Sequence, residues 1–420
     1  MSSSKLQATQ SSVSVPLERK DALLKMQRGP KKVYLEPAGK MHSYLKELIR
    51  YPPDGYEFIT HETALDRSVL EPLLNSNVVY FALQRNLLEK LIPMHLVKSY
   101  IERFLKKAPP DAALTYSYGH PIFRKEPWVV EVEWATQLTG FSAAHLRRYK
   151  GILEKVLAST HCKKIICWCE LCRNTVLAGM DCSQFRHKIE VVPHAVAKKE
   201  FTKVYNDDKV RLLFVGSANI PGEFDLKGGK EALEAFRLLT NKYDNLEMVV
   251  RSDVPPSIKR EYEGMPGLKI IEGTLPQKLL EREFLSADIF LVPGHHTPFM
   301  VLLDAMSYEL PIVTTDAYAN GEIVANGVTG FVIPASGSVP YYVSKFIPNG
   351  RSRRFRKAIK ELDHQVLHAV VDRTSILIEN PELRRQMGHA GRWEVEHGRF
   401  SIERRNEKLK RVFDEATSTQ

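Results

Sequence analysis

The chain lacks a run of about 18 consecutive apolar residues, the length that a helix needs to cross a bilayer. Its first sixteen residues are rich in Ser, Gln and Thr. They contain neither an apolar segment nor a small-residue cleavage site, so we expect no secretory signal there. These absences argue against an integral membrane protein and favour a cytoplasmic protein that is soluble or peripheral at a membrane.

Cysteine is also scarce. The chain has five cysteines, an odd number without a secretory context, which argues against a disulfide framework and fits a reducing cytosol. Four of them cluster at Cys162, Cys167, Cys169 and Cys172, with Cys182 nearby. Their thiolates could bind zinc or an iron–sulfur cluster, but four-ligand zinc patterns pair two separated clusters, whereas these lie in one strand-to-helix transition. We therefore predict no metal site.

Acidic residues are outnumbered by basic ones. The 60 Lys and Arg residues against 50 Asp and Glu residues give a formal net charge of +10. This charge favours acidic partners, among which phosphate-bearing ligands, anionic lipid surfaces and nucleic acid are all open. At 420 residues and 43% hydrophobic content, the chain exceeds what one core usually supports, so two domains are expected.

Short apolar runs typical of buried strands recur in two series, and helix-period segments separate most of them. Such alternation indicates parallel sheets covered by helices, which is an α/β fold. The first series comprises residues 33–35, 78–81, 112–116, 128–132, 164–167 and 189–192, and the second comprises residues 211–215, 246–250, 268–271, 289–292, 312–314 and 330–333.

The charged, non-periodic segment 197–209 separates the two series, and we interpret it as an interdomain linker. The predicted organisation is then a disordered tail over residues 1–28, an N-terminal domain over 29–196, the linker, a C-terminal domain over 210–395 and a terminal helix over 396–420 that can pack back on the N-terminal domain.

The strongest local signal is the segment 287–315, which is predicted to form a buried strand, a Gly-containing loop, a helix and a second strand. In a parallel sheet such a loop lies at the carboxyl edge, where ligands bind. The free backbone N–H groups of Phe299, Met300 and Val301 would open the helix, and together with the helix dipole they favour an anionic group. Asp304, on the same helix, could point back at ribose hydroxyls.

A second candidate is the strand and long loop over residues 212–236. Gly216 permits close backbone approach, and Lys227 supplies a point charge for phosphate. This pattern alone is weak, because many surface loops contain Gly and Lys. The pattern becomes informative when its position along the chain is considered together with that of the segment 287–315.

The residues of these motifs and their order along the chain resemble those of the family 4 glycosyltransferases of the GT-B fold. In the N-terminal half the resemblance is confined to residues 164–167 and the Val192-Pro-His-Ala-Val sequence. In the C-terminal half it comprises the strand ending in Gly-Ser before Lys227-Gly-Gly and Glu234-Ala-Phe, the Glu272-Gly turn, Ser286-Ala-Asp before a buried strand, Leu303-Asp-Ala-Met, Leu310-Pro-Ile-Val and Asn326-Gly-Val-Thr-Gly-Phe.

The resemblance implies two Rossmann-like domains whose parallel sheets face a central cleft. It also implies a retaining transfer of a sugar from a nucleoside diphosphate sugar to a glycan, lipid or small-molecule acceptor. The nucleotide sugar is the donor substrate, and no further cofactor or metal is required, in line with the lack of a clear Asp-x-Asp motif. Contact with an anionic membrane is compatible with this function, whereas nucleic acid is not an expected partner.

Residue by residue, the resemblance places Lys227 and the helix N-terminus on the diphosphate. Asp304 matches the second acid of the family's Glu-x7-Glu pattern, which binds ribose. The first acid falls at His296, which could hydrogen-bond sugar hydroxyls and is expected to titrate near pH 6.5. The arginine that usually follows the first glycine falls at Ser217, and Arg251 could offset the lost phosphate-facing charge.

In the N-terminal half, Glu131 and Glu133 end an apolar run and share a strand face, because strands have period two. Glu133 is carried over as the counterpart of a histidine that many family members hold near this place, where it would meet the acceptor. The alternative is that both acids are solvent-facing edge residues. His120 is a similar loop candidate near the cleft, although a lone histidine is more often structural.

Residues 84–107 carry many aliphatic and basic side chains, which would suit an interfacial membrane helix. Pro93 and His95 interrupt the segment, so a helix packed on the sheet is favoured. Two further functions stay open: a nucleotide-sugar epimerase of the same fold, and a non-catalytic binding protein that lost the family's first acid and arginine. The sequence does not specify the sugar, the base or the acceptor.

Overall fold

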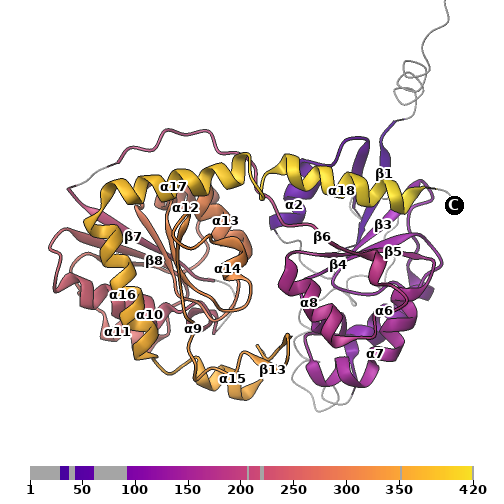
Figure 1. Ribbon diagram of the computed structural model, residues 1–420, viewed down its shortest axis with the longest axis horizontal. Coiled ribbons are helices and arrows are strands. Elements are labelled where there is room, and N and C mark those ends of the chain that lie inside the picture. Colours follow the sequence, from indigo (N-terminus) through magenta and orange to yellow (C-terminus); the bar gives the residue numbers. More distant parts are fainter. Residues whose placement is uncertain are drawn as a thin grey trace, which may run out of the picture.

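The computed structural model describes residues 29–36, 43–60, 92–205, 208–217, 222–350 and 352–418. These residues form two parallel six-stranded sheets, each accompanied by helices, and the two units lie side by side (Figure 1). The predicted α/β class with two Rossmann-like domains is therefore confirmed. The predicted strand 78–81 lies outside the described residues.

The N-terminal sheet has the strand order β2-β1-β3-β4-β5-β6, and all its pairings are parallel. Its inner strand β4 is buried at every position, as expected for a sheet covered on both faces. The short edge strand β2 was not predicted. The strands are β1 Lys31–Glu36, β2 Tyr56–Ile59, β3 Ala112–Tyr118, β4 Trp128–Val132, β5 Cys162–Cys167 and β6 Ile189–Val191. The helices are α2 Ser43–Arg50, α6 Met94–Leu105, η1 Ala135–Thr139, α7 Ala143–Ala158, α8 Glu170–Gly179 and η2 Arg186–Lys188.

The C-terminal sheet has the order β12-β11-β10-β7-β8-β9 and is also parallel. Its strands correspond in order to the second predicted series, whereas the antiparallel pair β13 and β14 was not predicted. The strands are β7 Val210–Val215, β8 Leu246–Arg251, β9 Leu268–Ile271, β10 Ile289–Val292, β11 Ile312–Thr315, β12 Gly330–Ile333, β13 Tyr342–Ser344 and β14 Ile347–Pro348. The helices are α9 Glu223–Leu226, α10 Gly229–Thr240, α11 Pro256–Glu261, α12 Gln277–Ser286, α13 Phe299–Ser307, α14 Asn320–Ile323 and α15 Arg353–Ala358.

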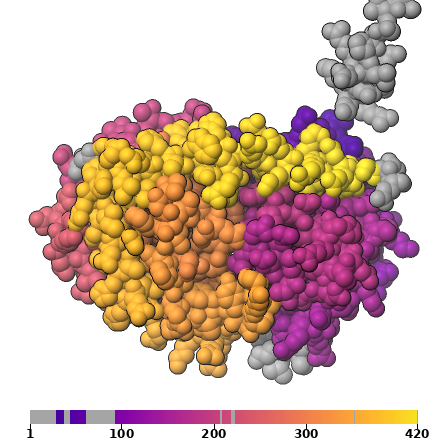
Figure 2. Space-filling model, in the orientation of Figure 1, coloured from indigo at the N-terminus to yellow at the C-terminus, as the bar shows by residue number. Residues whose placement is uncertain are grey.

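The last three helices connect the two domains. Helices α16 His364–Glu379 and α17 Pro381–Glu396 lie on the C-terminal domain, and α18 Ile402–Thr417 crosses to the N-terminal domain (Figure 1, yellow). There Leu409 and Phe413 join the core formed by Val33 and Tyr116. In Figure 2 the yellow segment extends over both domains. The end of the chain therefore bridges the domains and packs on the N-terminal sheet.

Helix α6 has one buried face, carrying Leu96, Ser99 and Glu102, and one face on which Tyr100 and Phe104 are exposed. The part of the predicted helix that the structure describes is thus packed on the domain, and residues 84–91 lie outside the described part. Across the described residues, no helix combines the length and apolar character needed to span a bilayer.

Candidate active site

A cavity of about 190 Å³ opens where the two domains meet, beyond the carboxyl ends of β4, β5 and β10. It brings together three predicted site residues: Glu133 from the N-terminal domain, and His296 and Phe299 from the C-terminal domain. Because ligands bind at the carboxyl edges of open parallel sheets, this cavity is the candidate active site. Its other lining residues are Trp134, Phe141, Trp168, Cys169, Cys172, Glu223, Leu226, His295, Thr297, Tyr318, Ala319, Gly350 and Phe355.

A larger hollow of about 790 Å³ lies at the opposite edge of the C-terminal sheet, where β7, β8 and β9 begin. Its charged lining residues include Arg211 and Lys269, which pair with Glu247 and Glu283. None of the predicted site residues lines it. We therefore place the chemistry in the smaller cavity between the domains.

His296 follows β10 and faces the interdomain cavity. Its ring bonds to the Leu226 carbonyl, and its buried Nδ1 atom has no hydrogen-bond partner among the residues that the structure describes. Burial, reinforced by the nearby Lys227 ammonium, lowers the pKa of His296 to about 3. The expected titration near pH 6.5 is therefore wrong for this environment. The imidazole stays neutral at physiological pH, so it can exchange hydrogen bonds with a sugar hydroxyl without adding charge.

Lys227, which follows α9, lies near His296, and Arg251, the last residue of β8, lies near Lys227. Burial lowers the pKa of Lys227, and the Arg251 guanidinium adds to this effect, while Glu223 opposes it. Burial also lowers the pKa of Arg251, which donates through Nη1 to the Gly216 carbonyl at 3.2 Å. Within the described part of the chain, neither cation forms an ion pair with a carboxylate. This pair of positive charges could be neutralised by an anionic ligand.

Backbone contacts fix the Lys227 loop against the His296 loop. The N–H of His295 donates to the Leu226 carbonyl at 2.8 Å. Gly228 has a φ of +75°, and a Cβ atom there would lie 2.2 Å from the Pro293 carbonyl oxygen. Only glycine allows both this left-handed conformation and this approach. The two motifs that are far apart in sequence are thereby held as one surface.

Helix α13 begins at the cavity with no side chain capping it. Its first intrahelical bond runs from the N–H of Leu302 to Pro298, which leaves the N–H groups of Phe299, Met300 and Val301 without an acceptor among the described residues. The Phe299 ring packs at this junction against Trp168, His194 and Phe400. The helix start can therefore present donors to an anion, as the sequence predicted.

Asp304 lies further along α13 and is absent from the cavity lining. Burial raises its pKa to about 6, with Glu47 and Glu281 adding to the rise and Lys199 opposing it. The structure therefore separates Asp304 from the cavity that holds His296, and its ribose role stays a prediction.

Gly216 and Ser217 follow β7 directly, at the carboxyl edge of the C-terminal sheet. A Cβ atom on Gly216 would lie 2.1 Å from the Ser252 Oγ atom, so the glycine is needed for packing against the next strand. The Ser217 carbonyl accepts a bond of 3.0 Å from the N–H of Asp253. Both residues thus shape the loop beside Arg251, and their predicted ligand contacts stay predictions.

Glu131 and Glu133 occupy different environments. Glu133 lines the cavity, whereas Glu131 is 2% exposed and accepts a bond of 2.8 Å from the Tyr116 hydroxyl. The alternative that both acids face solvent is therefore wrong. Burial raises the pKa of Glu131 to about 8, although Tyr116 and Trp168 hydrogen bonds oppose this rise. Its side chain is a neutral acid at pH 7, and His194 Nδ1 lies 3.6 Å away.

We expect Glu131→Gln to make stability less dependent on pH. The folded pKa lies above the unfolded value near 4.3, so the folded state holds an extra proton between roughly pH 4.3 and 8, and stability falls as the pH rises through this window. The slope approaches about 1.4 kcal/mol per pH unit for one proton. Urea unfolding from pH 5 to 8 measures it in the wild type and the variant. The exposed Glu263→Gln is the control, and a wild-type slope retained in Glu131→Gln would contradict the assignment.

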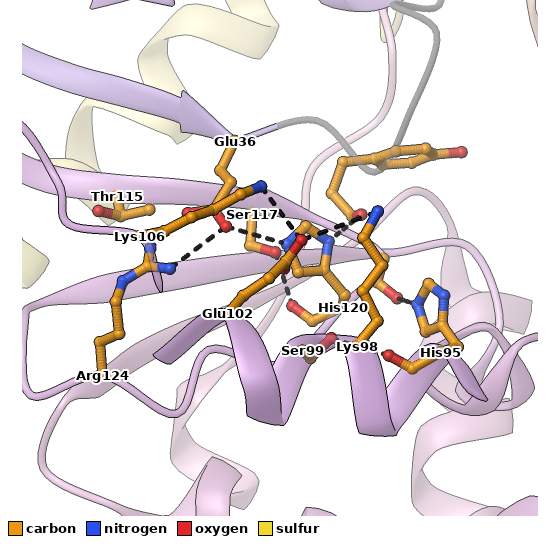
Figure 3. Close-up of polar contacts among 12 residues, drawn as sticks. Glu36, His95, Lys98, Ser99, Glu102, Lys106, Thr115, Ser117, His120 and Arg124 are labelled. Carbon is orange, nitrogen blue, oxygen red and sulfur yellow. Dashed lines mark hydrogen bonds and ion pairs between the residues drawn. The ribbon is translucent and has the colours of Figure 1, made fainter. Parts of the chain in front are cut away.

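His120 belongs to a buried charged cluster at the carboxyl ends of β1 and β3, which Figure 3 shows. Its Nε2 atom lies 3.6 Å from Glu36, and Glu36 also pairs with Arg124. Although burial opposes ionisation, the His120 hydrogen bond and the Arg124 charge lower the pKa of Glu36. Glu102 pairs with Lys106 at 3.1 Å.

The side chains of Glu36, Glu102 and His120 approach closely enough to hold a metal ion. However, Arg124, Lys98 and Lys106 already compensate the two carboxylates, so a divalent cation would have to displace bonded cations. The arrangement fits a buried network of structural ion pairs in the N-terminal domain better than a metal centre. The clustered cysteines do not form a group of three potential metal ligands among the residues described.

The sequence did not identify Trp168, His194, Tyr44 and Arg405 as neighbours of the site. Tyr44 and Trp168 rings pack on His194, with centroids 4.1 Å and 4.2 Å away. Arg405 comes from α18, and burial lowers its pKa to about 10. The only sequence signal for this group was the Val192-Pro-His-Ala-Val resemblance, which contains His194.

Comparisons with known proteins agree with this geometry. The family model described as Glycosyl transferases group 1 matches residues 199–345. WaaG, a glycosyltransferase involved in lipopolysaccharide biosynthesis, aligns with a TM-score of 0.53 and 15% identity over 92% of this chain and 100% of its own. Anabaena HepE in complex with UDP aligns with a TM-score of 0.53 and 13% identity over 91% of this chain and 99% of its own.

S. aureus TarM, solved with UDP and a glycosylated glycerol, aligns with a TM-score of 0.52 and 14% identity over 75% of this chain. The chain spans 58% of the length of TarM. No curated protein sequence matches the chain. At these identities the likeness to solved structures establishes the fold. That fold is GT-B, and residues 199–345 carry the match to the glycosyl transferases group 1.

Proposed function

We propose that the chain is a retaining glycosyltransferase that moves a sugar from a nucleoside diphosphate sugar to a glycan acceptor. The observation that carries the proposal is the pair formed by the buried Lys227 and the half-buried Arg251, which form no ion pair with a carboxylate within the described chain, Lys227 lying close to His296. A diphosphate would satisfy both charges and the free N–H groups. Because HepE and TarM were solved with UDP, uridine diphosphate is the nucleotide to test first.

The residues that line the cavity and the two cations close to it would then divide the reaction between them. Lys227, Arg251 and the α13 N-terminus would stabilise the charge that develops on the leaving diphosphate, without a metal being required. Neutral His296 would hydrogen-bond the transferred sugar. Glu133, on the opposite wall, would bind a hydroxyl group of the acceptor.

Aromatic side chains on the cavity wall support a carbohydrate acceptor. Trp134 and Tyr318 come from different domains, and their ring centroids are 5.0 Å apart. Phe141 lines the same wall and contacts Trp134. Flat apolar surfaces beside hydrogen-bonding groups suit the faces and hydroxyls of a sugar ring. A glycan is therefore the favoured class over a small-molecule or purely lipid acceptor.

A panel of UDP sugars, tested with and without oligosaccharide acceptors, separates this function from its rivals. A transferase gives an elongated acceptor with the donor's anomeric configuration, and NMR spectroscopy of the product reads this configuration. An epimerase changes the sugar nucleotide without an acceptor. A non-catalytic protein binds UDP in a calorimetric titration but makes no product, and an inverted product would contradict the retaining mechanism.

We also infer that the protein contacts an anionic membrane through α6. Tyr100, Ile101, Phe104 and Leu105 expose apolar surface, with Phe104 68% exposed. Arg103 lies between them and stacks over Tyr100 and Phe104, with its guanidinium 5.0 Å and 4.7 Å from their centroids. Apolar side chains with interleaved basic groups fit a negatively charged lipid surface, and the net charge of +10 adds long-range attraction.

Phe104→Glu should weaken binding to vesicles of phosphatidylcholine and phosphatidylserine by roughly 10- to 100-fold, because one large apolar side chain contributes about 1.5–3 kcal/mol when buried. Co-sedimentation measures this effect. Leu279→Glu in α12 replaces an exposed apolar residue of the other domain and is the matched control. Equal loss in both variants, or a wild type that is dimeric through α6 and ignores vesicles, would contradict membrane contact.

A further inference from the structure

Two cysteines meet at the start of α8, inside the candidate active site. Cys169 is the N-cap residue of this ten-residue helix, and Cys172 lies in its first turn. Their Sγ atoms are 3.2 Å apart. Both line the cavity of about 190 Å³, and Cys169 also lines a neighbouring hollow of about 460 Å³ between the domains. We propose that Cys169 and Cys172 are a redox-active dithiol that a small hydroperoxide converts into a disulfide.

The geometry selects this pair from the five cysteines. A C-x-x-C sequence at a helix start places two sulfurs on the same side of one turn, and only a small movement separates their contact from a bond. The remaining three do not line these cavities. Cys182, for example, directs its sulfur to the Val176 and Met180 carbonyls at 3.6 Å. Reactivity is therefore expected at one pair only.

The cavity also determines the oxidant. A space of about 190 Å³ admits hydrogen peroxide more readily than a bulky peptide disulfide. The Cys169 thiolate attacks one peroxide oxygen, the O–O bond breaks, and hydroxide leaves and takes up a proton as water. The Cys169 sulfenic acid is then attacked by the Cys172 sulfur, so an S–S bond forms, the S–O bond breaks and a second water leaves. The two thiols lose two electrons, which the peroxide gains.

Cys169 is the better nucleophile of the two. It is the N-cap residue of α8 and lines both hollows, so its sulfur is the one that a small oxidant reaches first. Cys172 lies deeper, and burial raises the pKa of its thiol well above the usual range, with its hydrogen bond to Cys169 adding to the rise. Cys172 therefore serves as the resolving thiol.

Domain closure controls this chemistry through Glu322 of α14. Its carboxylate accepts bonds from the N–H groups of Glu170 and Leu171 at 2.8 Å and 2.7 Å, so a residue of the C-terminal domain caps the helix that carries both cysteines. A carboxylate at this place repels a Cys169 thiolate and occupies the donors that would stabilise it. The dithiol is thus protected while the domains are closed and reactive when they open.

Disulfide formation and domain closure should influence each other. If closure disfavours the disulfide, the disulfide must disfavour closure by the same free energy. A disulfide that changes the first turn of α8 weakens the Glu322 cap and therefore disfavours closure. Oxidation should then reduce transfer, whereas a nucleotide that closes the cleft should slow oxidation. These two effects rest on the proposed function, but formation of the disulfide does not.

Intact-mass measurement of the full chain after hydrogen peroxide treatment tests the dithiol directly. The expected result is the loss of two hydrogen atoms, a cross-linked peptide joining Cys169 to Cys172, and full reversal by a thiol reductant. Cys172→Ser should instead give a sulfenic acid at Cys169 that dimedone traps, and Cys182→Ser should behave as the wild type. A wild type without the cross-link, or one in which Cys182→Ser prevents it, would overturn the proposal.

Glu322→Gln tests the coupling to closure. The amide oxygen keeps one acceptor for the helix N–H groups but removes the charge, so the cross-link should form several-fold faster than in the wild type. Glu403→Gln, on exposed surface of α18, is the control. Rates that are equal in Glu322→Gln and the wild type would overturn the control by Glu322. Because mass is measured, this result does not depend on whether sugar transfer is detected.

Discussion

Lys227→Ala is expected to weaken binding of UDP by roughly 10- to 100-fold and to leave binding of uridine almost unchanged. The expected loss corresponds to a charge-assisted hydrogen bond of about 1.5–3 kcal/mol to the diphosphate. Lys227 is 8% exposed and has no carboxylate ion pair in the described chain. The side chain is therefore already desolvated and available, so little of the interaction is lost to competition with water. Calorimetric titration with both ligands measures the difference.

The neighbouring Lys230→Ala is the matched control. Lys230 is half-buried, donates to the Lys360 carbonyl and does not line the cavity. Lys230→Ala removes one positive charge close to Lys227 in the sequence. Any loss of UDP affinity that is due to net charge alone would therefore occur in both variants. Lys227→Met adds a second control, because it keeps the length of the stem and should not lower the free energy of unfolding. Equal loss of UDP and uridine affinity in Lys227→Ala would remove Lys227 from the diphosphate site.

Much of the fold could be predicted because its signals are local. Apolar runs and helix periods identified the strands of the C-terminal sheet in order, and the Gly-rich loop and helix start marked its carboxyl edge. Of the predicted cavity residues, Glu133 follows β4 directly, and His296 and Phe299 lie in the loop and helix start after β10, so they lie at the carboxyl edges of their parallel sheets.

Other features depend on long-range packing and have no local signal. The burial of Glu131 follows from Tyr116, Trp168 and the distant α18, and the low pKa of His296 follows from enclosure beside Lys227. The alternative of an exposed acidic pair was wrong because distant side chains pack over Glu131. The titration of His296 near pH 6.5 was wrong because the reference value for a free side chain does not include desolvation. The sequence placed Asp304 by spacing alone, which cannot show which way a helical side chain faces the ligand.

Gly228→Ala is expected to lower the free energy of unfolding by roughly 2–5 kcal/mol. A left-handed conformation costs a non-glycine residue about 1–2 kcal/mol, and forcing a methyl group into a packed contact costs about 1–3 kcal/mol more. Both terms apply here, since φ is +75° and the new Cβ atom would lie 2.2 Å from the Pro293 carbonyl oxygen. Urea unfolding measures the change.

Gly222→Ala separates these two terms. Gly222 precedes α9, whereas Gly228 precedes α10, and Gly222 has a φ of +83°, but a Cβ atom there meets no atom of the described residues within 4 Å. Its variant should therefore lose only the conformational term of about 1–2 kcal/mol. The difference between the two variants isolates the contact between the Lys227 loop and the His296 loop. Because that contact positions Lys227 beside His296, folded Gly228→Ala should also bind UDP more weakly than folded Gly222→Ala. Equal destabilisation with equal UDP affinity would show that the two loops are not held together by this approach.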